Sequence, residues 1–254
     1  MTQFNRTLLI IIGDEILSGK RQDRHFPRVI ETLARRGLEL KWCRIIGDDP
    51  ALIVETLRQT LAGDDIVFCF GGIGATPDDH TRQCAAAAAG VPLVRHPDAV
   101  AEIEARFGAE AYPRRILMAD LAQGSRIIPN PYNRVPGFSL GHHHFLPGFP
   151  QMAWPMMDWV LDTLYPGMRN QAPETEAVIT VHDAMESPLL DLMNEFVRRY
   201  PNVRFSSLPH LGEEGERELE FGVRGPRPLV TEAMDYLKAE VEKLGFRWTE
   251  TETV

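Results

Sequence analysis

The sequence has 254 residues, which is long enough for one large domain or two small ones. Its formal net charge is −9, and 44% of its residues are apolar and 25% charged, as in ordinary globular proteins. The acidic balance excludes general binding to the phosphate backbone of nucleic acids, because that binding requires a concentrated basic face.

The N-terminal apolar run, residues 7–12, is too short to span a membrane, and no small-residue cleavage site follows it. Three cysteines lack a C-x-x-C pattern and lie in apolar or alanine-rich runs, which favours buried free thiols: Cys43, Cys69 and Cys84. We therefore expect a cytoplasmic protein with no membrane partner.

Strand and helix patterns alternate three times at the start of the chain. Apolar runs predict strands, and apolar residues at helical spacing predict helices that end at glycines. The predicted elements are a strand at 7–12, a helix from about 26 to Gly37, a strand at 40–46, a helix from Asp49–Pro50 to Gly63, a strand at 65–70, and a helix capped by Thr76 that runs to Gly90. This order predicts a right-handed, mostly parallel sheet flanked by helices.

The rest of the chain is divided by a polar stretch at 167–175, which we interpret as a linker. Before it, a short strand precedes Pro147–Gly148, and a Met- and Trp-rich helix at 152–165 is interrupted at Pro155. After it, the pattern is strand, helix, two strands and helix. We predict an α/β domain over residues 1–168 and a second, smaller α/β sandwich domain over residues 175–254.

The segment "GGIGATPDDHT", residues 71–81, follows a predicted buried strand. Its glycines permit close backbone approach to a ligand, and the start of the next helix would offer free amides to a phosphate. Thr76 with Asp79 resembles a capping box, so Asp78 and Asp79 could serve only as helix caps. However, Gly13–Asp14 and Gly47–Asp48 also follow strands, and acidic side chains at three strand ends suit a hard cation such as Mg²⁺ that bridges phosphate oxygens.

Four segments also resemble the molybdopterin-binding domain family in order and spacing. They are "IIGDEILSGKRQD" (11–23), "RIIGDD" (44–49), "GGIGATPDDHT" (71–81) and "FLPGFP" (145–150). This family includes the MogA/MoaB adenylyltransferases and the N-terminal region of CinA, the competence/damage-inducible protein A. The "GDE" turn, the paired aspartates and "NPYNRVPGF" are more similar to the CinA branch, without its C-terminal amidohydrolase domain.

The resemblance implies roles for individual residues. Asp48 and Asp79 match acidic residues implicated in metal and nucleotidyl chemistry, with Asp78 as a further metal ligand. The remaining expected ligand-binding residues are Gly13, Asp14, Ser18, Gly19, Gly71, Gly72, Gly74, Thr76, Pro147 and Gly148. Two departures from the adenylyltransferases are Ile73, where they have Thr, and Asp78, where they have Arg.

The implied function is hydrolysis of a nucleotide pyrophosphate such as ADP-ribose with Mg²⁺ or another divalent cation. Two alternatives stay open: a molybdopterin adenylyltransferase of molybdenum cofactor biosynthesis, and a module that binds a pterin or nucleotide without turnover. The apolar helix at 152–165 and the habit of the family both suggest a homo-oligomer.

The histidines are weaker candidates for metal binding than the aspartates. His142, His143 and His144 are adjacent, so in a strand they alternate faces and do not all bind one ion. We interpret them as partly exposed strand or turn residues, and His80 as a solvent-facing helix residue.

Overall fold

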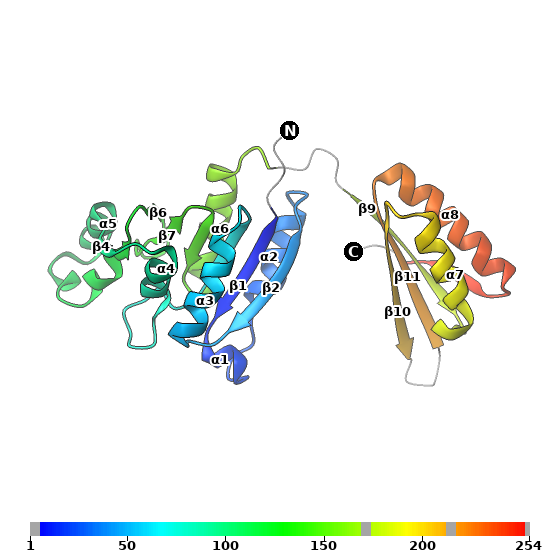
Figure 1. The fold of residues 1–254 in the computed structure, drawn as a ribbon, viewed down its shortest axis with the longest axis horizontal. Coiled ribbons are helices and arrows are strands. Elements are labelled where there is room, and N and C mark those ends of the chain that lie inside the picture. Colours follow the sequence, from blue (N-terminus) through cyan, green and yellow to red (C-terminus); the bar gives the residue numbers. More distant parts are fainter. Residues whose placement is uncertain (1–5, 169–173, 212–216, 252–254) are drawn as a thin grey trace. The chain divides into compact units, whose positions relative to one another are not determined.

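The computed structural model describes residues 6–168, 174–211 and 217–251. The chain forms two compact units, Met1–Asn170 and Gln171–Val254, each with its own core (Figure 1). Most of the predicted linker, residues 169–173, lies outside the described residues. No helix in the described part of the chain is long and apolar enough to cross a membrane.

The first unit is built on a six-stranded sheet of order β2-β1-β3-β8-β7-β6. The strands are β1 (Thr7–Ile12), β2 (Leu40–Ile46), β3 (Ile66–Phe70), β6 (Arg126–Ile128), β7 (Gly137–Leu140) and β8 (His143–Leu146). The first four strands of that order are parallel, and β7 and β6 are antiparallel to their neighbours. The predicted fold class is therefore confirmed, and the three N-terminal strands match their predicted bounds within one residue.

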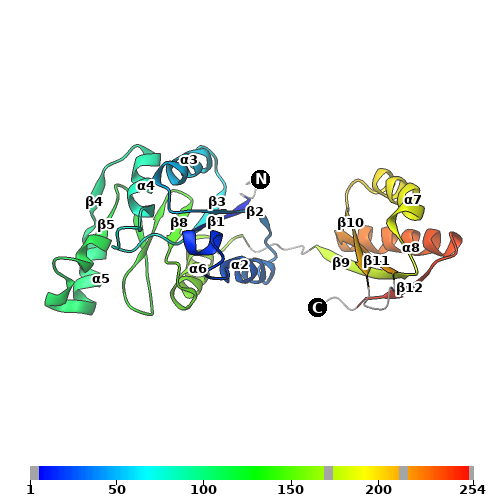
Figure 2. The same cartoon turned by 90° about the horizontal axis from the view of Figure 1, so that it is seen from below.

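Helices cover both faces of this sheet (Figure 2). One face packs against α3 (Pro50–Leu61), α4 (Thr81–Ala89) and α5 (Pro97–Phe107), and the other against α2 (His25–Ala34) and α6 (Pro150–Leu164). The Met-rich face of α6 belongs to the core, where Met156 and Met157 are fully buried. The predicted interruption at Pro155 is wrong: α6 continues through this exposed proline.

Residues 91–128 are less regular. They contain β4 (Leu93–Arg95) paired with β5 (Asp120–Ala122), and two 3-10 turns, η1 (Gly108–Ala111) and η2 (Arg115–Ala119). A short helix, α1 (Asp14–Leu17), follows β1. The three cysteines are free, and Cys69 and Cys84 are buried as expected, whereas Cys43 is only partly buried.

The second unit is a four-stranded antiparallel sheet of order β10-β11-β9-β12. Its elements are β9 (Thr175–His182), α7 (Glu186–Arg199), β10 (Arg204–Leu211), β11 (Arg217–Gly225), α8 (Arg227–Lys243) and β12 (Arg247–Glu250). Apolar side chains of α7 and α8 form a core with one face of the sheet. The sequence pattern missed β12, whose residues RWTE are partly exposed and leave no run of apolar side chains.

Candidate functional site

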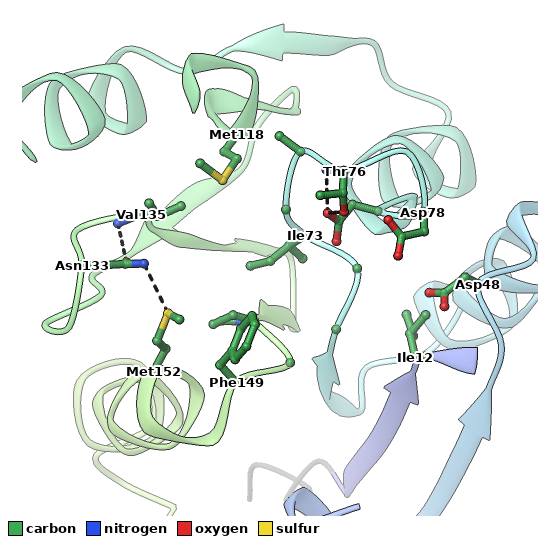
Figure 3. Close-up of a pocket in the computed structure, with 18 of the residues that line it drawn as sticks. Ile12, Asp48, Ile73, Thr76, Asp78, Met118, Asn133, Val135, Phe149 and Met152 are labelled. Atoms are coloured by element: carbon green, nitrogen blue, oxygen red, sulfur yellow. Dashed lines mark hydrogen bonds between the residues drawn. The ribbon is translucent and has the colours of Figure 1, made fainter. Parts of the chain in front are cut away.

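The register of the parallel strands brings four turns to one edge of the first sheet. Ile12 pairs with Ile46, and Phe70 pairs with both Ile11 and Leu146. The turns after β1, β2, β3 and β8 therefore start at nearly the same level, where ligands bind in such sheets. A pocket of about 470 Å³ lies at this edge (Figure 3).

The glycine loop after β3 has a backbone that other residues do not adopt easily. Gly71 has φ +104°, and a Cβ there would lie 2.1 Å from the carbonyl oxygen of Ile12. Gly72 has φ +66°, and a Cβ there would lie 2.3 Å from Oγ1 of Thr81. The buried Thr81 holds this turn, since its hydroxyl donates to the Gly71 carbonyl and its amide to the Gly72 carbonyl, both at 2.9 Å.

The predicted helix start at Thr76 is wrong, because α4 begins at Thr81. Asp78 and Asp79 therefore lie in a turn ahead of the helix, not in its first turn. The capping-box pairing is nevertheless formed locally: the amide of Thr76 donates to Oδ2 of Asp79 at 2.8 Å, and its hydroxyl donates to the same atom. This leaves Oδ1 of Asp79 without a hydrogen bond among the described residues.

Asp48 and Asp14 exchange backbone hydrogen bonds across the turns after β2 and β1. The amide of Asp14 donates to Oδ2 of Asp48 at 2.9 Å, and the amide of Asp48 donates to Oδ1 of Asp14 at 3.2 Å. Partial burial raises the pKa of Asp48, and the neighbouring acids Asp14, Glu15 and Asp78 raise it further, against the opposing effect of the Asp14 amide. Asp48 therefore lies in a locally negative environment, and its Oδ1 accepts no hydrogen bond from the described residues.

Most of the sequence-predicted residues line this pocket. They are Gly13, Asp48, Gly71, Gly72, Gly74, Thr76, Asp78, Asp79, Pro147 and Gly148. Asp14, Ser18 and Gly19 do not line it: Asp14 acts through Asp48, while Ser18 and Gly19 lie exposed just after α1. Figure 3 shows Asp48, Asp78 and Thr76 on the same side of the pocket.

The opposite wall was missed from the sequence. Figure 3 shows on it apolar and amide side chains from segments far apart in the chain: Met118, Asn133, Val135, Phe149 and Met152. Phe107 and Asn130 also line the pocket. The "NPYNRVPGF" similarity was the one available signal for Asn130 and Asn133. Asn130 is buried and holds the turn, since its amide donates to Asn133 Oδ1 at 2.8 Å and to the Val135 carbonyl at 2.9 Å.

Two cationic side chains, Arg21 and Arg115, also line the pocket and were not predicted. The guanidinium of Arg115 lies 4.6 Å from the centre of the Phe107 ring and donates to Oε2 of Glu110 at 3.0 Å. Arg21 and Arg115 share the pocket with four carboxylates, those of Glu15, Asp48, Asp78 and Asp79. The pocket is thus acidic beside the glycine loop and has cationic groups elsewhere on its wall.

Two buried side chains support the pocket from behind. The guanidinium of Arg82 donates to backbone carbonyls of the glycine loop and of residues 117 and 120. His25 bonds to the Gly148 carbonyl through Nε2 at 3.1 Å and stacks on Phe70, and its burial lowers its pKa. Neither residue was singled out in the sequence.

The structure corrects the interpretation of the three adjacent histidines. They do alternate faces, but His143 and His144 are buried, not partly exposed. His143 bonds to Thr60 at 2.8 Å, and His144 bonds to Ser139 at 2.8 Å and Tyr165 at 2.9 Å, so both are satisfied core residues. His80 is a half-buried residue that precedes α4 and does not line the pocket.

Within the described residues, no three His, Cys, Asp or Glu side chains are arranged to hold one metal ion. Any cation in this pocket would therefore need oxygen atoms from a ligand or water in addition to the carboxylates of the chain.

Comparison with known proteins identifies the family of this chain. The family described as "Probable molybdopterin binding domain" matches residues 8–166. The chain belongs to this family. A CinA-like protein of Syntrophotalea carbinolica is 33% identical over 186 residues, which are 70% of this chain and 45% of that protein. The chain therefore spans about half the length of the CinA-like relatives that it matches.

Two further relatives cover different parts of the chain. A crystal structure of CinA from Thermoplasma acidophilum, described as having unknown function, shares 28% identity with a TM-score of 0.57, covering 61% of this chain and 95% of that one. A protein of Pyrobaculum calidifontis is 26% identical over 243 residues, 93% of each chain, so its match includes both units.

Proposed function

We propose that this CinA-like protein is a divalent-metal-dependent hydrolase of a nucleotide pyrophosphate such as ADP-ribose. One observation carries the proposal: a single pocket has a glycine loop and carboxylates on one side and an aromatic, Met- and Asn-bearing wall on the other. A dinucleotide pyrophosphate has matching parts, with a charged centre and a planar base.

The carboxylates suit a hard cation that takes only one or two of its ligands from the protein. Asp79 uses Oδ2 to hold its own loop, and Asp48 uses Oδ2 to accept the amide of Asp14 in the neighbouring turn. Each keeps Oδ1 free of hydrogen bonds from the described residues. Mg²⁺ is commonly bound by one or two carboxylates and completed by phosphate oxygens and water. Asp48 and Asp79 would hold the ion, with Asp78 as the nearest additional carboxylate in the turn. A bound ion would neutralise phosphate charge and activate water for hydrolysis.

The remaining contacts with the substrate would be made by the backbone and side chains of the protein. Backbone amides of the glycine loop would bind the pyrophosphate, since peptide N–H groups are strong donors to anions. Phe107, Phe149 and Met118 would exclude water and contact the base. The nitrogen of the Asn133 amide would donate to the base edge, since among the described residues it donates only to Sδ of Met152, a weak acceptor, at 3.3 Å. Arg21 and Arg115 would neutralise the phosphate that is not beside the carboxylates.

A pterin ligand bound without turnover is the second candidate. The family match favours it, and the same apolar wall fits the planar ring of molybdopterin while the loop fits its phosphate. An adenylyltransferase would use the same residues but has to bind a triphosphate, and Asp78 adds negative charge where a cation would help.

The test is hydrolysis of ADP-ribose with Mg²⁺, Mn²⁺ or Co²⁺, measured by product chromatography for wild type, Asp48→Asn and Asp79→Asn. We expect kcat to fall about 100-fold or more in both variants, because each substitution removes a charged oxygen beside the reacting phosphate. Asp64→Asn is the matched control, since Asp64 is exposed and outside the pocket.

Equal rates in wild type and in the two pocket variants would disprove the assignment. Calorimetry against ADP-ribose, ATP and molybdopterin then separates the alternatives. Binding of molybdopterin without any product would support the binding module, and adenylated molybdopterin formed from ATP would support the transferase.

A further inference from the structure

We propose that Arg82 is a positioning residue that aims the amides of Gly74 and Ala75 at a bound phosphate and holds the facing segment, residues 115–120, against the glycine loop. The inference rests on the anion-binding part of the proposed function and does not depend on turnover.

Among the described residues, the Arg82 side chain donates hydrogen bonds to backbone carbonyls only. Nε donates to the carbonyl of Ile73 at 3.0 Å and to that of Gly74 at 3.2 Å, and a terminal nitrogen also donates to Gly74 at 2.8 Å. The other terminal nitrogen donates to the carbonyls of Leu117 at 2.6 Å and Asp120 at 2.9 Å. Arg82 is only 4% exposed, so these four carbonyls satisfy a buried cation that has no hydrogen-bonded carboxylate among the described residues.

The bonds to Ile73 and Gly74 fix the direction of two peptide groups. The only cis peptide bond in the described chain is Tyr112–Pro113, so the peptide groups that link Ile73, Gly74 and Ala75 are trans. In a trans peptide the N–H points away from the carbonyl. Since both carbonyls face Arg82, the amides of Gly74 and Ala75 face away from it.

These two amides are available to a ligand. Gly74 and Ala75 both line the pocket, and within the described residues neither amide donates a hydrogen bond. Successive N–H groups of this kind form an anion-binding concavity. The buried positive charge behind them polarises both peptide groups, which strengthens the donors that face the pocket.

The bonds to Leu117 and Asp120 connect the loop to the facing wall. Met118 and Arg115, which line the pocket, belong to this same segment. The Asp120 side chain is occupied by Arg95, with 3.1 Å between Nη2 and Oδ2, so it does not neutralise Arg82 by direct contact. One buried guanidinium therefore sets the distance between the phosphate side and the opposite wall.

The test uses the chain of residues 1–254 with Arg82→Ala, Arg82→Lys and the exposed control Arg58→Ala, with inorganic pyrophosphate and Mg²⁺ as the probe. We expect Arg82→Ala to bind pyrophosphate about 10- to 100-fold more weakly, as for groups that orient a site without touching the ligand. Added guanidinium chloride, at millimolar concentrations below the denaturing range, should restore affinity in Arg82→Ala and have no effect on Arg58→Ala. Arg82→Lys should be intermediate, because an ammonium keeps the charge but lacks the planar fork.

A second measurement needs no ligand or activity. The ¹⁵N-resolved amide resonances of Gly74 and Ala75 should move in Arg82→Ala and Arg82→Lys, return towards wild type with guanidinium in the Ala variant, and stay unchanged in Arg58→Ala. If Arg82→Ala does not fold, Arg82→Lys gives the same two comparisons.

Unchanged affinity with unchanged Gly74 and Ala75 resonances in a folded Arg82 variant would overturn the inference. So would the absence of pyrophosphate binding by the wild type. If the wild type binds pyrophosphate but hydrolyses no nucleotide, the proposed hydrolase fails while the role of Arg82 is still decided by the affinity of its variants.

Discussion

Gly71 is the residue whose backbone constrains the glycine loop most. Its φ is +104°, and a Cβ at this position would lie 2.1 Å from a backbone oxygen, so both conformation and space exclude a side chain. We expect Gly71→Ala to lower the free energy of unfolding by about 3–5 kcal/mol, as backbone strain and overpacking add. Urea unfolding monitored by circular dichroism measures this.

Gly19 provides the matched control for this substitution. It also has a positive φ, +72°, but no atom of the described residues lies within 4 Å of a Cβ there. Gly19→Ala should therefore cost only about 1 kcal/mol, the penalty of the left-handed conformation alone, and leave ligand binding unchanged. Equal losses for the two variants would show that the contact with Ile12 does not matter.

Single residues also show what the sequence could reveal about the site. Asp48 and Asp79 were predictable because each follows an apolar strand and a glycine-bearing turn. Arg82 was not, because nothing in a sequence tells a buried arginine bonded to carbonyls from a solvated helix residue. The role of Arg82 arises from contacts between segments far apart in the chain, such as that with Leu117, separated by 35 positions.

At the scale of elements, β8 makes the first unit sensitive to acid. Burial, with a smaller contribution from the neighbouring His142, lowers the pKa of His143 to about 4. Below pH 6.5 this histidine binds a proton in the unfolded chain, whereas in the folded protein it stays neutral until the pH approaches about 4. The free energy of unfolding therefore falls as the pH drops from about 6.5 to about 4. We expect His143 to lower the free energy of unfolding by about 2–3 kcal/mol between pH 7 and pH 4.5. The variant His143→Gln should lose that much of the pH dependence.

Urea unfolding at both pH values checks this prediction, with His210→Gln, at an exposed position of the second unit, as the surface control. Only the difference between the two pH values is compared, because the substitution itself changes the bond to Thr60 at every pH. A pH dependence as steep in His143→Gln as in wild type would contradict it.

Elements were predicted well where one local pattern determined them. The run 7–12 and the Asp49–Pro50 start of α3 were confirmed, since Asp49 does accept from the amides of Ala51 and Leu52. The start of α4 was wrong because Thr81 is held by Gly71 and Gly72, a contact across the turn that outweighs the Thr76–Asp79 pairing. Tertiary contacts of this kind are absent from a single sequence.

For the whole molecule, the two units have separate cores, and this makes them candidates for independent folding. We expect a fragment of residues 1–168 to unfold cooperatively and to bind pyrophosphate as the full chain does, because every residue of the pocket lies within it. A fragment of residues 174–254 should also unfold cooperatively. Calorimetry of both fragments, with the full chain as reference, measures this.

Loss of pyrophosphate binding in the 1–168 fragment, with its fold intact by circular dichroism, would show that the second unit contributes to the site. Self-association stays a prediction at this scale, and sedimentation velocity of the full chain would decide it.

The exchange of hydrogen bonds between Asp14 and Asp48 has an evolutionary consequence. Each carboxylate accepts the backbone amide of the other residue, so a side chain without an acceptor oxygen at either position would leave an amide in the opposite turn unpaired. Gly47 belongs to the same arrangement, since a Cβ there would lie 2.4 Å from Oδ1 of Asp14. Positions 14, 47 and 48 should therefore vary together among relatives, as one inherited unit and not as three independent sites.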